Sequence, residues 1–378
     1  MRALHAVPAD PATLVPALRS ALDGGPAVLP VERPGEALAD VDDRVALVVR
    51  TSGSSGVPKE VALSADALIA SARATEAVLA GPAAWVLALP GHYVAGAQVI
   101  VRALLAGGEP VPLPPGPFSA VGFAAAVRLL PDDRARCSAL VPTQVHRVVE
   151  AVEAGDRAVG EAVRSLDAVL VGGGRLSEDL AARAGAAGLH AVRTYGASET
   201  AGGCVYDGVP IPGVRVRVVD GEVRLAGPVL AEGYLDPART ARAFVDGPDG
   251  RWYRTGDAGQ WDGARLRIAG RLDDVIITGG EKVSLGLVEQ AVQALPGLGE
   301  AVVVRAPDPE WGEVPVVVTA VDAALEPVRR AVADRLGRAA APRRVLVVQA
   351  VPLLASGKPD RVLLTRLAAE SGPPLHRI

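Results

Sequence analysis

The stretch SLDAVLVGGGRLSEDLAARAGAAGLHAVRTYG, residues 165–196, decides the fold. It opens on the short aliphatic run SLDAVLVGGG (165–174), continues with the alanine-rich SEDLAARAGAAG (177–188) and closes on HAVRTYG (190–196). Short apolar runs bounded by glycine are typical of buried strands, and the alanine-rich stretch between them predicts a helix. Two strands joined by a helix favour a parallel pair.

The same alternation extends toward the N-terminus as far as residue 45. We expect further strands at 44–50, 84–90, 109–113 and 136–142, and helices at 64–81, 94–107, 119–130 and 143–155. This succession predicts an α/β fold with a mainly parallel, doubly wound sheet that carries helices on both faces. In such sheets the loops at the carboxyl ends of the strands bind the ligand.

Beyond residue 210 the pattern changes. Closely spaced strands at 213–220, 222–227, 251–257 and 264–270, with no long helix between them, predict an antiparallel β subdomain. The tail after Arg271 predicts a small α+β domain, with helices at 285–295 and 326–340 and strands at 300–306, 314–321 and 343–351. We therefore expect a large domain over 1–271 and a small one over 272–378.

The charge balance excludes some function classes. The 378 residues hold 39 Lys plus Arg against 43 Asp plus Glu, with a net charge of -4 and no basic cluster, which argues against nucleic acid as a partner. No apolar run reaches 18 residues, so we expect no membrane partner. The two cysteines, Cys137 and Cys204, form no disulfide or zinc pattern, and a cytoplasmic protein is expected.

Only three of the cations are lysines: Lys59, Lys282 and Lys358. An ammonium is a compact point charge that a guanidinium does not replace, so these positions are candidate functional sites. Lys59 ends the segment TSGSSGVPK (51–59), whose backbone N–H groups, hydroxyls and cation suit a polyphosphate. Val57 and Pro58 separate the glycine from the lysine, so this is not a Walker A loop. The alternative is a flexible Gly/Ser linker.

The segment TSGSSGVPK resembles the phosphate loop of the adenylate-forming enzymes, a superfamily of acyl-CoA synthetases, adenylation domains and luciferases. Further segments resemble that superfamily's motifs in the same order: LPGHYVAG (89–96), VGGG (171–174), YGASET (195–200), YRTGD (253–257), GRLDDVIITGGEKVS (270–284) and LLASGKPDR (353–361). The compact form is most similar to the actinobacterial o-succinylbenzoate-CoA ligases of menaquinone biosynthesis. Because the phosphate loop starts at Thr51, we expect the family's first subdomain to be largely absent.

The resemblance implies an AMP-forming acid-thiol ligase. ATP, Mg2+ and CoA would be co-substrates, an aromatic carboxylate the substrate, and no prosthetic group would be tightly bound; a homodimer is left open. The alternatives are another aryl-acid CoA ligase, or a stand-alone adenylation enzyme that loads a carrier protein. A nucleotide-binding regulatory protein without chemistry is a third reading, which the joint presence of Glu199, Asp257 and Lys358 disfavours.

The nucleotide site follows from these motifs. Tyr195 offers a ring face to a base, Glu199 an oxygen to Mg2+, and Asp257 a carboxylate to a ribose diol. Thr200 and Lys358 are the expected catalytic groups beside the α-phosphate, Lys358 arriving on a mobile small domain. The full set expected to bind ATP or AMP is Thr51, Ser52, Gly53, Ser54, Ser55, Gly56, Lys59, Gly172, Gly173, Gly174, Tyr195, Gly196, Thr200, Asp257 and Arg271. Ordinary alternatives exist: a helix N-cap in YGASET, a Gly-Asp turn at Asp257 and a solvated lysine in SGKP.

The acyl site and the hinge complete the expectations. His92, Val99, Arg102 and Gly202 are expected to contact the acyl group, with His92 also taking part in catalysis. Arg102 or Arg193 would bind a second substrate carboxylate, although Arg102 reads equally well as a helix-surface residue. The resemblance implies Asp273 as the hinge and a pantetheine tunnel at Gly279 and Gly280. The role of Lys282 is left undecided between a ligand contact and exposure.

Overall fold

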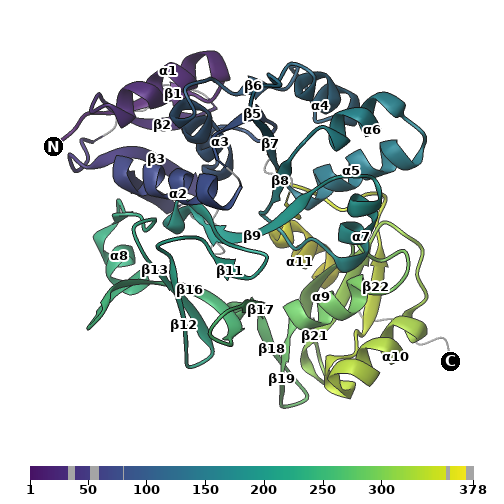
Figure 1. Ribbon diagram of the computed structural model, residues 1–378. Coiled ribbons are helices and arrows are strands. Elements are labelled where there is room, and N and C mark those ends of the chain that lie inside the picture. The colour runs from purple at the N-terminus through teal and green to yellow at the C-terminus, as the bar shows by residue number, and fades with distance from the viewer. Residues whose placement is uncertain (33–38, 52–58, 80, 355–357, 372–378) are drawn as a thin grey trace.

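The computed structural model describes residues 1–32, 39–51, 59–79, 81–354 and 358–371. Figure 1 shows the chain running from an N-terminal sheet at the upper left, through a helix-rich region at the upper right, to a C-terminal α/β region at the lower right. Among the described residues, no helix combines the length and the apolar character that a bilayer crossing requires.

The central sheet is the one that the alternation predicts. Its strands are β5 (Ala83–Leu87), β6 (Val111–Pro112), β7 (Ala135–Leu140), β8 (Ala168–Val171), β9 (Ala191–Ala197), β10 (Gly202–Tyr206) and β11 (Val209–Pro210). They run in the order β11-β10-β9-β8-β7-β5-β6, parallel from β6 to β9 and antiparallel at β10 and β11. The doubly wound α/β fold is confirmed.

Helices cover both faces of this sheet because successive strand residues point to opposite sides. Trp85 and Leu87 pack into the core on one side, and Val86 and Ala88 into the core on the other. On the first side α3 (Val94–Leu105) lies against the sheet, and α1 (Pro11–Leu22) and α2 (Ala65–Val78) pack on α3 in the same core. The second side holds α4 (Ala120–Val127), α5 (Pro142–Glu153), α6 (Arg157–Arg164) and α7 (Glu178–Ala186).

The strand expected at 44–50 does not lie in the central sheet. It is β3 (Val45–Thr51), which pairs in parallel with β2 (Ala27–Val31) and antiparallel with β4 (Lys59–Ser64). A separate sheet of order β1-β2-β3-β4-β14 results, with β1 (Leu4–Pro8) and β14 (Gly233–Tyr234) at its edges. The phosphate-loop segment therefore joins two antiparallel strands, whereas we expected the strand at 44–50 to continue the alternation of strands and helices in the central sheet. A short connection cannot make the crossover that parallel pairing needs, so the two strands that it joins pair antiparallel.

The antiparallel subdomain is present. Its strands are β12 (Arg215–Val219), β13 (Glu222–Ala226), β15 (Phe244–Gly247), β16 (Gly250–Trp261) and β17 (Leu266–Arg271), and the short helix α8 (Pro237–Ala243) precedes β15. β13 and β15 flank β16, and β17 pairs with β16 from Asp257 to Trp261. The following 3-10 turn η2 (Leu272–Asp274) begins directly after the expected domain boundary, which stays a prediction.

The C-terminal region forms its own sheet. It contains β18 (Val275–Thr278), β19 (Glu281–Ser284), β20 (Val302–Asp308), β21 (Gly312–Thr319) and β22 (Arg344–Val347), packed against α9 (Leu285–Gln293), α10 (Leu325–Leu336) and α11 (Arg361–Glu370). Two expectations need correction. The helix expected at 326–340 ends at Leu336 because Gly337 takes a φ of 91°, and a 3-10 turn η3 (Arg338–Ala340) follows. The α11 helix was not expected.

Candidate active site

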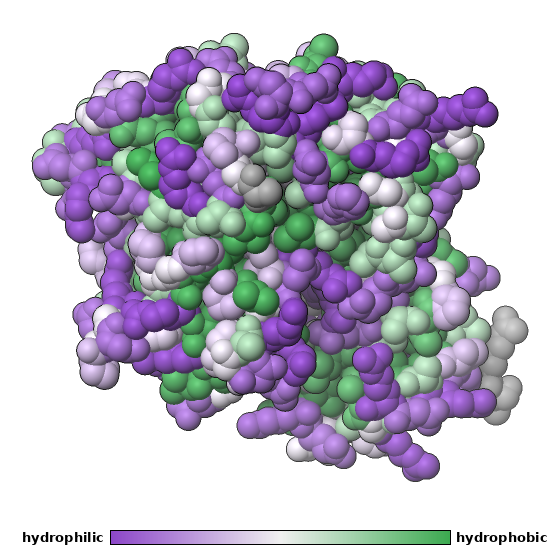
Figure 2. Space-filling view, viewed as in Figure 1, coloured by the Kyte–Doolittle hydropathy of each residue, from purple (hydrophilic) through white to green (hydrophobic). Residues whose placement is uncertain are grey.

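Residues from four parts of the chain meet at the carboxyl ends of β8 and β9, the edge where doubly wound sheets bind ligands. Figure 2 shows a hollow near the centre of the molecule, where the C-terminal region meets the rest of the chain, with polar side chains around it. The described members of the expected nucleotide site lie around this edge.

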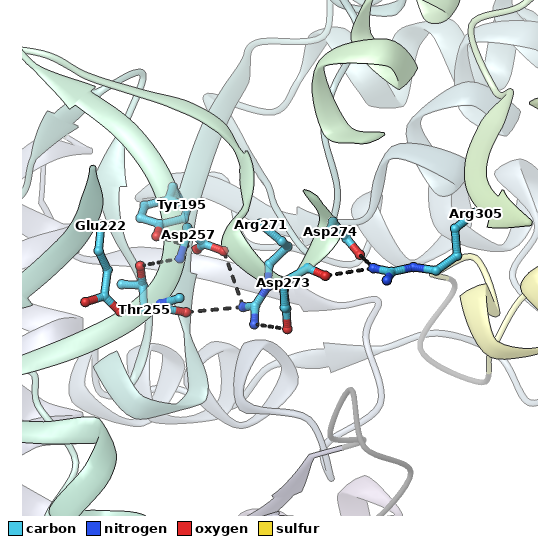
Figure 3. A network of polar contacts seen from close by, with 9 residues as sticks. Tyr195, Glu222, Thr255, Asp257, Arg271, Asp273, Asp274 and Arg305 are labelled. Atoms are coloured by element: carbon cyan, nitrogen blue, oxygen red, sulfur yellow. Dashed lines mark hydrogen bonds and ion pairs between the residues drawn. The ribbon is translucent and has the colours of Figure 1, made fainter. Parts of the chain in front are cut away.

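Asp257 on β16 is joined to two other predicted residues (Figure 3). The Tyr195 hydroxyl donates to its Oδ2 at 2.6 Å, and Arg271 Nη1 donates to its Oδ1 at 3.3 Å. Burial raises the pKa of Asp257, and the two donors oppose that rise. A carboxylate has about four acceptor positions, so Asp257 keeps the capacity to accept two further hydroxyls.

The backbone around Asp257 is held by its neighbours. Its N–H donates to Thr255 Oγ1 at 3.0 Å, and that hydroxyl donates to the carbonyl of Val223 at 2.8 Å. The buried Glu222 accepts from Gly256 N at 3.3 Å and from Arg254 Nε at 2.9 Å. These contacts position the carboxylate of Asp257 before any ligand arrives.

Glu199 is linked to the phosphate-loop hairpin through a tyrosine that the sequence analysis missed. Tyr234 on β14 donates its hydroxyl to Glu199 Oε1 at 2.6 Å, and Lys59 Nζ lies 5.7 Å from the centroid of the Tyr234 ring. Thr51 and Lys59 are register partners at the end of β3 and β4. The predicted residues between them, Ser52, Gly53, Ser54, Ser55 and Gly56, lie outside the described residues. One orienting hydroxyl leaves Glu199 the second oxygen for a cation.

Thr200 is fully buried and its hydroxyl closes a local turn. Thr200 Oγ1 accepts from Ala197 N at 2.9 Å and lies 2.8 Å from the carbonyl of Gly202. Gly196 could not carry a side chain, because a Cβ there would lie 2.2 Å from the Gly202 carbonyl oxygen. The turn therefore brings β9 and β10 into close backbone contact beside the expected phosphate position.

Lys358 lies against the glycine loop that follows β8. A Cβ at Gly173 would lie 3.1 Å from Lys358 Cε and 3.3 Å from Val141 Cγ1, and one at Gly172 would lie 2.5 Å from Thr194 Oγ1. The pKa of Lys358 is lowered by burial, although the residue as a whole keeps an exposed surface. The lysine of the C-terminal tail and the glycine loop, 184 residues apart in sequence at their nearest, are thus neighbours.

The expected acyl residues lie on or beside α3. Val99 and Arg102 are buried, and the Arg102 guanidinium carbon lies 5.3 Å from the centroid of the Trp85 ring, so Arg102 is not a helix-surface residue. Its Nε has no hydrogen-bond partner among the described residues. Burial lowers the pKa of His92, which favours the neutral imidazole. Arg193 is instead paired with Glu178 at 2.9 Å on the surface.

Gln98, one helical turn before Arg102, was not foreseen. It is fully buried, its Oε1 has no partner within the described part of the chain, and its Cγ lies 3.5 Å from where a Cβ at Gly202 would be. Only the three-dimensional contact with Gly202 marks this glutamine, because nothing in its local sequence distinguishes it from other helical positions.

The residues expected to form the hinge and the tunnel lie farther along the chain. Arg271 holds Asp273 with two hydrogen bonds, Nε to Oδ1 at 2.9 Å and Nη2 to Oδ2 at 3.0 Å. Gly279 packs against Trp311, since a Cβ at Gly279 would lie 2.6 Å from the indole ring. A Cβ at Gly280 would meet nothing, and Lys282 is exposed on β19.

Trp311 and Gly279 line an open cavity of about 440 Å³. Arg343 lies over the Trp311 ring, with its guanidinium carbon 4.3 Å from the ring centroid, and Arg329, Arg330 and Arg338 also line the cavity. Glu281 and Glu326 line the cavity as well, so arginines outnumber acidic residues there by four to two; an indole ring beside several guanidinium groups suits a ligand that combines a planar base with phosphates.

The chain belongs to the AMP-binding enzyme family. Residues 9–235 match the AMP-binding enzyme domain, and residues 287–358 match the AMP-binding enzyme C-terminal domain. The chain is 40% identical to the probable 2-succinylbenzoate-CoA ligase of Mycobacterium tuberculosis, over 97% of this chain and 98% of that protein. It is 29% identical to the 2-succinylbenzoate-CoA ligase of Enterococcus faecalis, over 84% of this chain and 68% of that protein.

A solved structure is similar as well. A variant of MenE from Escherichia coli with bound OSB-AMS aligns with a TM-score of 0.68 and 26% identity, covering 91% of this chain and 73% of that one. The adenylate-forming fold and family expected from the motif order are confirmed.

Proposed function

We propose that this chain is an AMP-forming o-succinylbenzoate-CoA ligase of menaquinone biosynthesis. The observation that carries the proposal is the 40% identity to the Mycobacterium tuberculosis protein across nearly the full length of both chains. We also propose that the chain works in the cytoplasm as a large domain, 1–271, and a small domain, 272–378, that reorients between two half-reactions.

In the first half-reaction a substrate carboxylate oxygen attacks the α-phosphorus of ATP, and the bond to pyrophosphate breaks. Asp257 accepts the ribose hydroxyls, Tyr195 lies against the adenine, and Lys59 and Lys358 neutralise charge on the phosphates and the attacking carboxylate. The closeness of Lys358 to Gly173 supports this arrangement for adenylation. Thr200, Thr51, Ser52, Gly53, Ser54, Ser55, Gly56, Gly172, Gly174, Gly196 and Arg271 complete the proposed nucleotide site.

Glu199 is the proposed ligand of Mg2+. The fit is chemical, since Mg2+ in nucleotide sites takes one or two carboxylates together with phosphate oxygens, and the Tyr234 hydroxyl occupies only Oε1 of Glu199. When bound, the ion screens the negative charge of the phosphates. Tyr234 orients the carboxylate and connects it to the face on which Lys59 lies.

In the second half-reaction the CoA thiol loses its proton, the thiolate sulfur attacks the acyl carbonyl carbon, and the bond to AMP breaks. We propose that the nucleotide part of CoA binds the cavity beside Trp311 and Arg343, and that pantetheine passes Gly279 and Gly280. The guanidinium groups around an indole face support this assignment.

The acyl pocket is proposed to be formed by His92, Val99, Arg102 and Gly202. A neutral His92 can accept or donate one hydrogen bond without adding charge. Arg102 is proposed to bind the second carboxylate of the substrate. Its unpartnered Nε favours it over Arg193, because a buried donor without a partner is unfavourable unless a ligand satisfies it.

Mass spectrometry of the products from ATP, CoA, Mg2+ and a panel of aromatic acids tests the proposal. We expect AMP and o-succinylbenzoyl-CoA. A thioester from benzoate but not from o-succinylbenzoate would replace the substrate assignment with another aryl-CoA ligase. Acyl-adenylate that accumulates with free CoA present, and is consumed only by a carrier protein, would indicate a stand-alone adenylation enzyme.

A further inference from the structure

Two arginines form hydrogen bonds to the turn η2, one from each side (Figure 3). Arg271, at the end of β17, holds the carboxylate of Asp273 through two hydrogen bonds of 2.9 and 3.0 Å. Arg305, on β20 of the C-terminal sheet, donates from Nη2 to the main-chain carbonyl of Asp273 at 2.7 Å. The side chain and the carbonyl of one residue are thus attached to different parts of the protein.

Arg305 also carries two carboxylate contacts. Its Nη2 lies 3.7 Å from Asp274 Oδ1, and its Nη1 lies 3.6 Å from Glu313 Oε1 on β21. β18 pairs with β19 from Val275 onward and with β21 at Thr278, so Asp273 and Asp274 precede both ladders. Arg305 therefore fastens the peptide between Asp273 and Asp274 to the C-terminal sheet.

Only one rotatable main-chain bond, the Cα–C bond of Asp273, lies between the group that Arg271 holds and the group that Arg305 holds. The carboxylate of Asp273 moves with its Cα and Cβ, whereas its carbonyl oxygen moves with the following peptide plane. Rotation about N–Cα would displace the carboxylate from Arg271, and rotation beyond the carbonyl would displace the peptide from Arg305. Rotation about the Cα–C bond of Asp273 preserves both sets of hydrogen bonds.

We propose that Arg305 is a positioning residue that confines the movement between the two half-reactions to the Cα–C bond of Asp273. The inference rests on the proposed function, which supplies the two half-reactions. Contacts across the boundary in the present arrangement, such as Gln290 Nε2 to the carbonyl of Ala269 at 3.3 Å, would break during the movement, whereas the Arg305 contact would persist. When rotation is confined to one bond, the small domain can adopt only a few defined orientations relative to the large domain.

The first test separates the half-reactions. In Arg305→Met we expect the single-turnover conversion of preformed acyl-adenylate to thioester to slow about tenfold, the effect of losing one charge-assisted hydrogen bond. KM values for ATP and acid should stay within about twofold, because the proposed contacts to both, apart from that of Lys358, come from the large domain. Arg305→Lys, which keeps one donor for the carbonyl, should recover most of the rate. Glu313→Gln is the matched control: it removes the charge of one of the two carboxylates beside Arg305 and leaves the contact to the Asp273 carbonyl, so its rate should match the wild type.

The second test measures the pivot and does not depend on turnover. Spin labels on cysteines placed at the exposed positions Arg157 and Arg366 report the distance between α6 and α11, while the native Cys137 and Cys204 are buried. With AMP and CoA bound, we expect Arg305→Met to broaden the distance distribution, and Arg305→Lys and Glu313→Gln to leave it narrow.

Unchanged distributions and rates in Arg305→Met would overturn the inference. Equal losses in both half-reactions together with a lowered melting temperature would also overturn it, since a merely structural role gives that result. If Arg305→Met fails to fold, the distance distribution of Arg305→Lys is the test. A broad distribution in Arg305→Lys would then overturn the inference. A wild-type enzyme that makes no adenylate from o-succinylbenzoate would refute the proposed substrate, yet the distance measurement with AMP and CoA would still test Arg305.

Discussion

Replacing Lys358 by Met removes one positive charge from the proposed adenylation site and nearly keeps the length of the side chain. The ammonium lies beside the glycine loop, with Nζ 3.9 Å from where a Cβ at Gly173 would be. A pair of unit charges about 4 Å apart at an effective dielectric constant of about 20 interacts by about 4 kcal/mol, which corresponds to about 10³ in rate. Because one side of Lys358 is exposed, solvent screening reduces this, and we expect adenylation to slow by about 30-fold to 1,000-fold.

The assay is acid-dependent exchange of radiolabelled pyrophosphate into ATP, compared with thioester formation from preformed acyl-adenylate. Exchange should show the full loss, whereas thioester formation should change less than about threefold, because the charge is needed only while the phosphate–carboxylate bond forms. Near-normal exchange in Lys358→Met, or equal losses in the two assays, would refute this reasoning.

The rate of adenylation should also depend on pH in a direction set by the pKa of Lys358. Burial lowers the pKa of Lys358, so the charged form is lost at a lower pH than for an exposed lysine. Adenylation should therefore decline as the pH rises through this lowered pKa. Lys358→Arg should move the decline to higher pH, because a guanidinium stays protonated, but the wide planar group should fit poorly beside Gly173.

Three further substitutions probe other parts of the site. Tyr234→Phe removes the 2.6 Å hydrogen bond to Glu199 and should raise the Mg2+ concentration for half-maximal exchange about tenfold; an unchanged Mg2+ requirement would disconnect Glu199 from the metal. Gly279→Ala places a Cβ 2.6 Å from Trp311 and should slow thioester formation about tenfold while exchange stays within about twofold, and a loss confined to exchange would contradict the tunnel assignment. Arg102→Met should raise KM for o-succinylbenzoate about 10-fold to 100-fold but leave KM for benzoate within about twofold, whereas equal effects on both acids would remove Arg102 from the carboxylate site.

The sequence predicted the features that depend on local pattern. The alternation around 165–196 sufficed for the central sheet because strand and helix periodicities are properties of short segments. The order of the motifs from Thr51 to Arg361 sufficed for the family. The resemblance assigned Tyr195, Asp257, Lys358 and the glycine loop to one nucleotide site; in the structure Tyr195 contacts Asp257 and Lys358 lies beside the glycine loop, while their roles stay predictions.

Pairings between distant segments could not be predicted in the same way. Tyr234 contacts Glu199 because β14 adds to the edge of β4, an association that no local pattern encodes. Gln98 and Arg305 likewise gain their significance from partners far along the chain. The assignment of β3 to a separate sheet depended on its pairing with β2, which the periodicity of β3 itself does not determine.

Competition between two acids tests the central claim most directly. The enzyme receives ATP, Mg2+, CoA and equal concentrations of o-succinylbenzoate and benzoate, and the two CoA thioesters are quantified by mass spectrometry at low conversion, which gives the ratio of kcat/KM values. We predict that o-succinylbenzoyl-CoA exceeds benzoyl-CoA by more than about tenfold, because one buried charge pair is worth at least about 1.4 kcal/mol. Equal amounts, or an excess of benzoyl-CoA, would contradict the account.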